Sequence, residues 1–373
     1  MSESMGRDLA GGHLRTWRDG GGRVVGYACV LTPVEVLDAA GVLPFRVKAL
    51  GCSKTDRADA RLSRFNCGFC RSCLQLALEG AFDFLDGVIE TNGCDQLRGM
   101  FENWQYVAPA PWFHYLKVPH VVTPESLDYL EHELRRLAAA LERGFGAAVT
   151  DERLIEAIER RERIRASLGR LADLRERPAP AVTGSEALSE VIAGSALPPA
   201  VFQELLDEAI DRFERRPAPP APARRLLLGG AAIDDVELVR DIESLGGAVV
   251  ADTLCFGSRG VSLELSEGWR DAPVRALAER TLRGSTCPRM YDELPSRLEL
   301  VLATAARARV DGVVLVHNKF CDVHGIDNAL LRLELEKRGV PVLALEREYG
   351  AAADRGRLRT RTQALLERIG GGR

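Results

Sequence analysis

The order of hydrophobic and polar residues predicts short buried strands alternating with helices at the start of the chain. From Arg23, the segment RVVGYACVLTPVEVLDAAGVLPFRVKAL reads as strand, loop, helix and strand, with Pro33 at the helix start and Gly41 just past its end. A second unit follows, with an apolar helix pattern, the buried strand FDFLDGVIETN, a polar turn and the strand candidate PWFHYLKVP. We therefore predict a first α/β lobe at residues 23–125, after an N-terminal extension at residues 1–22.

The periodicity then changes, and long charged segments with apolar residues three and four apart predict helices over residues 126–214. Thr150, which precedes two acidic residues, is a candidate N-cap for one of these helices. The proline-rich stretch that follows predicts a semi-rigid linker at residues 215–223. A second α/β lobe is predicted at residues 224–373, where RRLLLGGAAID, GGAVVADTLC, VDGVVLVHNKFC and VPVLALERE give four strand candidates. The predicted fold class is α/β, with two Rossmann-like parallel-sheet lobes joined by a helical segment.

Composition narrows the function classes. With 373 residues, 46% hydrophobic and 28% charged, the chain can bury real cores without disulfides. We expect a cytoplasmic protein with no membrane partner, because no uncharged apolar run approaches the about 18 residues of a spanning helix and the N-terminus lacks a signal-peptide core. The net charge of -4 argues against nucleic acid as a partner. No Walker A sequence is present, so the chain should not hydrolyse ATP by itself.

The cysteines carry the candidate chemistry. DGVIETNGCDQLRGMF, from Asp86, and DGVVLVHNKFCDVHGI, from Asp311, both run strand, polar turn, Cys-Asp and helix. This pattern puts Cys94 and Cys321 at the carboxyl ends of strands, where ligands collect in open α/β sheets. It also puts them at helix N-termini, whose free amides and positive dipole end favour thiolates and an anionic cluster. Although a lone cysteine is more often a buried structural thiol, the matched pair indicates one site between the lobes.

The run Cys67, Cys70 and Cys73 has a ferredoxin-like C-x2-C spacing and could form a local cluster site. However, the residues after Cys70 look helical, so Cys73 could face a helix interface, and no C-x3-C-P segment completes the ferredoxin pattern. Zinc is another alternative because two histidines flank Cys321, although paired C-x2-C knuckles are missing. Four further cysteines stand in or beside predicted loops, where each could approach a bound cofactor, bind a second cluster or be a buried thiol: Cys29, Cys52, Cys255 and Cys287.

Three segments together resemble a known family: GYACVLTPVEVLDAAGVLPFRV, NCGFCRSCLQLALEGAFDFLDGVIETNGCDQLRG, and DGVVLVHNKFCD with GVPVLALERE. The family is that of 2-hydroxyacyl-CoA dehydratases and benzoyl-CoA reductases, with iron-sulfur subunits of the 2-hydroxyglutaryl-CoA dehydratase D-component type. The likeness runs from about Val24 to Glu367. It implies one [4Fe-4S] cluster in the inter-lobe cleft, held by three separated cysteines that correspond here to Cys67, Cys94 and Cys321, with one iron left open.

The resemblance also implies partners. A homologous second iron-sulfur subunit would pair with this chain, and a separate ATP-hydrolysing activator would supply single low-potential electrons. The electron would pass to the thioester carbonyl of a bound acyl-CoA and form a ketyl radical anion, from which a hydroxyl leaves or an aromatic ring is reduced. The segment 101–120 is slightly more similar to the ring reductases. Its Phe101, Trp104, Trp112 and Phe113 could line an acyl pocket, although such aromatics are more often core.

Several points stay open at this stage. Arg357 stands where the family often carries Gln, and no catalytic residue beyond the cluster ligands is indicated. The additional Cys29, Cys52 and Cys287 suggest a double-cubane reductase of small molecules as an alternative, although we find no further Cys-Pro segment of the kind that this branch usually carries before its Cys-Asp. A non-catalytic partner subunit of the same fold is the other alternative.

Overall fold

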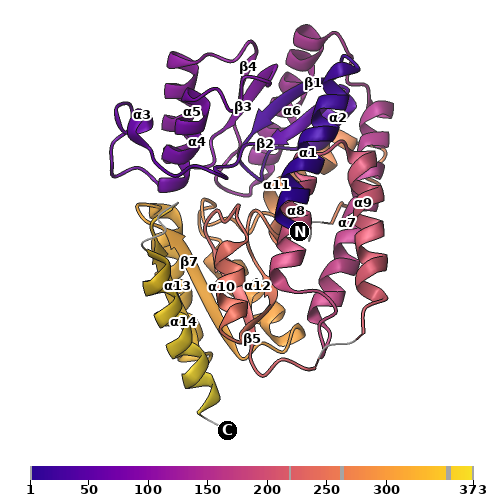
Figure 1. The fold of residues 1–373 in the computed structure, drawn as a ribbon. Coiled ribbons are helices and arrows are strands. Elements are labelled where there is room, and N and C mark those ends of the chain that lie inside the picture. The colour runs from indigo at the N-terminus through magenta and orange to yellow at the C-terminus, as the bar shows by residue number, and fades with distance from the viewer. Residues whose placement is uncertain (1, 218–219, 261–263, 350–353, 372–373) are drawn as a thin grey trace.

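The computed structural model describes residues 2–217, 220–260, 264–349 and 354–371, and it contains two four-stranded parallel sheets. Figure 1 shows the two lobes one above the other, with long helices running along one side of both. The predicted fold class, α/β with two parallel-sheet lobes, is therefore confirmed. No described helix is long and apolar enough to cross a membrane.

The sheet of the first lobe has the strand order β2-β1-β3-β4. Its strands are nearly continuous apolar runs because helices cover both faces, and side chains of β1 alternate between two core clusters. The strands are β1 (Arg23–Tyr27), β2 (Val42–Arg46), β3 (Gly87–Thr91) and β4 (Phe113–Leu116). The helices of this lobe are α2 (Val34–Ala39), α3 (Asp56–Asp59), α4 (Gly68–Leu78) and α5 (Asp95–Val107).

A helix that the sequence pattern did not indicate precedes this lobe. The polar, Gly-rich N-terminus forms α1 (Ser2–Asp19). At its end, the indole Nε1 of Trp17 donates a hydrogen bond to the carbonyl oxygen of Arg23, at 3.0 Å. A tertiary contact therefore anchors this helix to the start of β1, and the local composition gave no signal for it.

The helical segment follows the first sheet, and hydrogen-bonding residues define its helix ends. Thr150 caps its helix as predicted, since its side chain accepts a hydrogen bond from Arg153 N. Thr183 forms a capping box with Glu186. Gly146, with φ of 78°, ends the helix that begins at Pro124. The four helices are α6 (Pro124–Phe145), α7 (Asp151–Glu176), α8 (Gly184–Gly194) and α9 (Pro199–Glu214).

The second lobe repeats the first with the strand order β6-β5-β7-β8, and all four predicted strands are present. Only glycine fits at Gly230, where φ is 119° and a Cβ would lie 1.9 Å from the carbonyl oxygen of Val316. The strands are β5 (Arg225–Gly230), β6 (Ala248–Asp252), β7 (Gly312–Asn318) and β8 (Val342–Arg347). The helices are η1 (Ser258–Gly260), α10 (Glu237–Ser244), α12 (Leu294–Arg307), α13 (Asp322–Lys337) and α14 (Arg355–Gly370). Helix α11 (Pro273–Arg283) belongs to the same part of the sequence but packs against α6 in the core of the first lobe.

Strand order fixes where a site can form. In each sheet the first strand lies inside, and the chain continues first to one side of it and then to the other. The loops after β1 and β3, and those after β5 and β7, therefore diverge at a crevice at the carboxyl end of the sheet. Ligands of open α/β sheets bind at such switch points. The Cys-Asp turns follow β3 and β7, so they lie at the two crevices.

Helix α7 joins both lobes through ion pairs. Near its middle, Arg161 forms a bidentate pair with Asp38 of the first lobe. Near its end, Arg175 donates to the buried carboxylate of Asp252 in the second lobe, at 2.8 Å. The lobes also touch directly, because the backbone N–H of Ala49 donates to a buried carboxylate of the second lobe at 2.6 Å. These contacts hold the two crevices in one arrangement.

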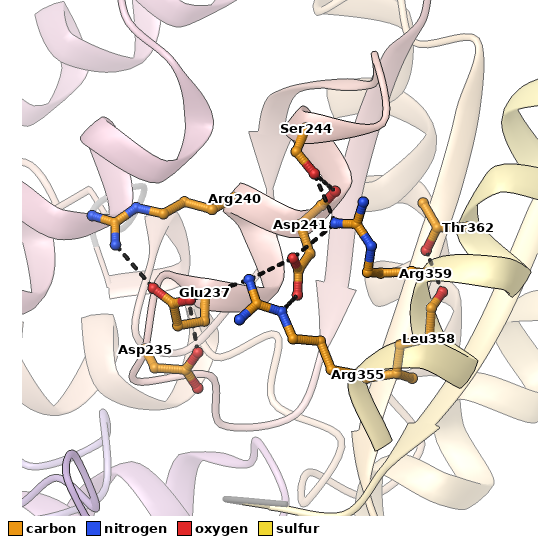
Figure 2. Close-up of polar contacts among 9 residues, drawn as sticks. All are labelled: Asp235, Glu237, Arg240, Asp241, Ser244, Arg355, Leu358, Arg359 and Thr362. Atoms are coloured by element: carbon orange, nitrogen blue, oxygen red, sulfur yellow. Dashed lines mark hydrogen bonds and ion pairs between the residues drawn. The ribbon is translucent and has the colours of Figure 1, made fainter. Parts of the chain in front are cut away.

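The C-terminal helix is attached to the second lobe by a shared carboxylate. Figure 2 shows Arg355 and Arg359, both on α14, directed at Asp241 of α10. Arg355 makes two hydrogen bonds to this carboxylate, at 2.6 and 2.7 Å, and Arg359 adds one at 3.0 Å. Bidentate arginine pairs fix orientation as well as distance, so α14 is held in register against α10.

Candidate functional site

Three cysteines occupy the same structural position in three different helices. Cys67, Cys94 and Cys321 are the N-cap residues of α4, α5 and α13. The first two helices belong to the first lobe and the third to the second lobe. The free N–H groups and the positive dipole end of each helix favour a thiolate or an anionic ligand at this position. One set of three helix ends thus presents three sulfurs from both lobes.

The sulfurs of these cysteines interact. The side chain of Cys67 forms hydrogen bonds with those of Cys321 and Cys70, which lowers the pKa of Cys67 well below its usual value. The same contact with Cys67 raises the pKa of Cys321. Burial raises the pKa of Cys94 to about 12, and Cys67 acts on it electrostatically in the same direction. Without a metal, the contacts thus favour the thiolate form of Cys67, with the neighbouring cysteines as thiols. A bound metal would deprotonate those neighbouring thiols as well.

All three cysteines of the C-x2-C-x2-C run are buried in the core of the first lobe. The side chains of Cys67 and Cys70 are in contact, and Cys73 is fully buried beside Leu74. Among the described residues, no three His, Cys, Asp or Glu side chains are grouped so that they could hold a metal ion. A cubane does not need such a group, because each cysteine binds a different iron at its own corner. Three N-cap cysteines from separate helices, with Cys67 in contact with Cys321 and acting electrostatically on Cys94, fit a cubane in this respect.

Two polar side chains brace the loop that carries Cys67. The amide oxygen of Gln96, in the first turn of α5, accepts a hydrogen bond from Cys67 N at 3.0 Å. Arg71 forms a bidentate pair with Asp59, at 2.6 and 2.8 Å, and also approaches Glu348 of the second lobe at 4.0 Å. The loop positions of Cys67 and Cys94 are therefore linked to each other and to the other lobe.

The turn that carries Cys321 contains an unusual backbone conformation. Phe320 has φ of 64°, in the left-handed region that bulky residues rarely adopt. Its ring packs edge-on against Phe65 of the first lobe, with ring centroids 5.3 Å apart. Such conformations persist where surrounding structure enforces them, and they cluster at functional sites. The turn therefore sets the direction of Cys321 and joins the lobes beside Cys67.

Three further cysteines extend the group along the lobe interface. Cys29, in the loop after β1, interacts electrostatically with Cys94 and with Cys287. Cys287 in turn interacts with Cys255, and burial raises its pKa. Burial likewise raises the pKa of Cys29, to about 11. The buried Arg289 faces Cys29, Cys287 and Cys94, so a positive charge lies against this row of thiols.

A cavity lies beside this row, between the lobes and α7. Its volume is about 170 Å³, and the loop after β1 forms one wall. Tyr27, Arg46, Arg161, Cys255 and Arg280 line it with side chains of both lobes and the helical segment. The volume is below the roughly 300 Å³ at which pockets for drug-sized ligands begin, so it has room for a small acyl group but not for a whole acyl-CoA.

The other sequence candidates fall outside this group. Phe101 and Trp104 are core residues, and Trp112 stacks on His114, so none of them lines a described cavity. Cys52 donates to Lys54 O at 3.1 Å and interacts with Ser72 of α4. Arg357 donates to the Asp354 carboxylate and to a backbone oxygen of β8, which gives it a structural contact.

Sequence reasoning did not identify the residues that position the cysteines. Gln96, Arg289 and the left-handed Phe320 act through contacts between segments far apart in the chain. A signal existed only for Phe320, because the polar turn before Cys-Asp lacks a glycine in the second lobe but has Gly93 in the first.

Taken together, the fold and the site define a two-lobed α/β protein with a cysteine group where its lobes meet. The chain belongs to the family of 2-hydroxyglutaryl-CoA dehydratase D-components, whose model matches residues 29–369. The family membership that the sequence resemblance predicted is thereby confirmed. Since its relatives are enzyme subunits, the chain is a subunit of an acyl-CoA enzyme of the 2-hydroxyacyl-CoA dehydratase and benzoyl-CoA reductase family.

Relatives from both kinds of enzyme match over most of their length. The (R)-phenyllactyl-CoA dehydratase beta subunit of Clostridium sporogenes is 24% identical, over 87% of this chain and 86% of the relative. One of the benzoyl-CoA reductase subunits of Thauera aromatica is also 24% identical, over 92% and 91%. A putative dehydratase subunit, YjiM, of Escherichia coli is 27% identical, over 93% and 91%. These similarities do not separate dehydration from ring reduction.

Proposed function

We propose that the chain binds a [4Fe-4S] cluster through Cys67, Cys94 and Cys321 in the inter-lobe cleft. The observation that carries this proposal is that all three are N-cap residues, from both lobes, with interacting side chains. Three helix N-termini would offset the negative charge of the thiolates and cluster together. When bound, such a cluster would supply one-electron transfer and leave one iron without a cysteine ligand.

The proposed reaction is transfer of single low-potential electrons from an ATP-dependent activator to an acyl-CoA thioester. The chain's own part is to hold the acyl group beside the cysteine row, for which the cavity of about 170 Å³ offers room. We slightly favour ring reduction over dehydration, on the sequence of residues 101–120. Anaerobic assays with benzoyl-CoA and with 2-hydroxyacyl-CoAs distinguish the two reactions.

We further propose a homologous second subunit as the partner. The relatives in Clostridium sporogenes and Thauera aromatica are each named as one subunit of an enzyme, so they are parts of larger assemblies. The activity assays therefore need the co-expressed pair and its activator. Metal analysis needs only this chain, provided that it is purified without oxygen.

Iron content tests the ligand assignment. The anaerobically purified chain should contain about four irons, as expected of one cubane, and Cys67→Ser, Cys94→Ser and Cys321→Ser should each remove most of them. Cys52→Ser is the matched control, because its sulfur donates to the backbone oxygen of Lys54 and not to a proposed ligand. Cys70→Ala and Cys73→Ala should keep the iron, whereas a local triad would lose it. A full complement of iron in both Cys94→Ser and Cys321→Ser would disprove the inter-lobe assignment.

One observation favours a second candidate, the double-cubane reductase. Cys29, Cys255 and Cys287 continue the cysteine row along the interface, next to Cys94. This alternative predicts about eight irons per chain in a homodimer, and loss of half of them in Cys287→Ser. A non-catalytic subunit would instead be free of iron, stable in air and readily alkylated at the three proposed ligands.

A further inference from the structure

A second polar cavity lies within the second lobe, beside Cys287 at one end of the cysteine row. It opens at the carboxyl ends of β5 and β6, between η1, α12 and α13, and has a volume of about 10 Å³. Such a volume holds about one water-sized group. The polar side chains that line it are Thr253, Arg259, Thr286, Arg297, His324, Asp327 and Asn328.

This cavity collects buried polar atoms without partners. Arg259 lacks a partner at Nε and Nη1, Arg297 at Nη1, His324 at Nδ1, and Asn328 at both amide atoms. The exposed fractions of these four side chains lie between 1% and 8%. Native proteins satisfy nearly all buried hydrogen-bonding groups, so several orphan atoms around one small space indicate a bound group. Most of them are donors.

The charges around the cavity do not balance. Arg297 donates to the Asp327 carboxylate at 2.8 Å, which pairs one arginine with the one acidic side chain in the lining. Arg259 has no ion pair within the described residues. The imidazole of His324 and the thiol of Cys287 also face Arg259, and neither is an acidic side chain that pairs with it. One buried guanidinium is thus left without a counter-charge, which is costly inside a protein.

We infer that this cavity binds a small oxyanion of single negative charge, of the size of formate, nitrate or bicarbonate, with Arg259 as its main partner. A water molecule would satisfy some N–H groups, but it would leave the charge of Arg259 uncompensated. An oxyanion accepts hydrogen bonds from the two arginines and the Asn328 amide at once. The small volume admits one oxygen atom deep in the cavity and excludes a large ligand.

The position of the anion gives it a structural consequence. It would join η1, which carries Arg259, to the first two turns of α13, which carry His324 and Asn328. The N-cap of α13 is Cys321. The bound anion would therefore hold the helix that presents Cys321, although it needs neither iron nor acyl-CoA to bind.

Anion titration of the anaerobically purified chain tests the inference. In a buffer without other small anions, nitrate and formate should raise the melting temperature saturably, since a ligand of the folded state stabilises it. Sulfate at equal ionic strength controls for general salt effects, which would stabilise the fold without saturation. A larger rise with sulfate than with nitrate, or no saturable rise with either, would overturn the inference.

Variants locate the effect. Arg259→Met should weaken nitrate binding by roughly ten- to a hundredfold, the loss expected for a charged hydrogen-bonding partner. Arg307→Met, which removes an exposed arginine, is the matched control and should bind normally. Asn328→Asp adds a carboxylate to the cavity, so this variant should fold and lose its response to nitrate. Equal affinity in wild type, Arg259→Met and Asn328→Asp would place the anion elsewhere.

The inference can fail separately from the proposed function. Cys94→Ser alters the first lobe and should lose iron, yet it should bind nitrate with unchanged affinity if the anion site is independent. Loss of nitrate binding in Cys94→Ser would contradict that independence, whatever the iron content of the wild type.

Discussion

The two Cys-Asp turns occupy equivalent places in the two lobes but are built differently. After β3, the chain reaches Cys94 through Gly93, and the Cys94 sulfur accepts a hydrogen bond from Leu97 N at 3.5 Å. After β7, it reaches Cys321 through the left-handed Phe320, and the backbone amide of His324 acts on the Cys321 thiol. Both sulfurs thus meet the backbone of their own helix, but only the second is also hydrogen-bonded to Cys67 across the lobe boundary.

An asparagine supports each turn, again in different ways. Asn92 exchanges two hydrogen bonds with the backbone of Val118, at 2.7 and 3.1 Å. Asn318 donates to Ala232 O at 3.0 Å and accepts from the guanidinium of Arg347 at 2.8 Å. The comparison shows that the position of the cysteine sulfur matters for the site, and that different backbone conformations and hydrogen bonds in the two turns can produce equivalent positions.

Replacing each of the two asparagines by alanine should give the largest difference in stability between the two turns. Asn318 is fully buried, so Asn318→Ala would leave a guanidinium N–H and a carbonyl unpaired and should lower the free energy of unfolding by about 3 kcal/mol. Asn92→Ala, at a half-buried position, should cost about 1 kcal/mol. Urea denaturation of both variants measures the difference. Equal losses would mean that the two turns are supported alike.

Substituting the residue before each cysteine should change the stability of the fold less. In Gly93→Ala, the new Cβ would lie 3.0 Å from both the Cys29 sulfur and Leu97, so overpacking should cost about 1 kcal/mol. Phe320→Gly relieves a left-handed backbone but loses an aromatic contact, and these effects of about 1 kcal/mol nearly cancel. Thermal unfolding measures both. A clear destabilisation by Phe320→Gly alone would reverse this part of the comparison.

The smallest expected difference is one of pH dependence. Two residues before Asn92 lies the buried Glu90, whose pKa burial raises to about 7, while Val316 stands two residues before Asn318. A carboxyl group whose pKa is higher in the folded than in the unfolded chain contributes stability that is fully present when the pH is below its unfolded-state pKa. This contribution is lost as the pH rises through the folded-state pKa of about 7. Glu90→Gln should therefore flatten the decline of unfolding free energy between about pH 5 and 8. An unchanged pH slope in this variant would show that Glu90 does not titrate in this range.

Much of the fold followed from local pattern, and the positioning of the site did not. The buried strands of both sheets are short apolar runs bounded by polar turns, so periodicity was sufficient to find them. The repeated Cys-Asp turn was visible for the same reason. Helix α1 escaped detection because its anchor, Trp17, acts through a tertiary contact. The unpaired Arg259 depends on packing between η1, α12 and α13, which no local pattern encodes.

Helix α7 has a consequence for how this family can vary in length. Its first-lobe contact at Arg161 and its second-lobe contact at Arg175 are about 21 Å apart along the helix axis, at 1.5 Å per residue. One inserted residue between them would turn the second arginine by about 100° and withdraw it from Asp252. The helix fixes the spacing between its contacts with the two lobes. We therefore expect homologues to tolerate insertions at its ends and to conserve the number of residues between these two ion pairs.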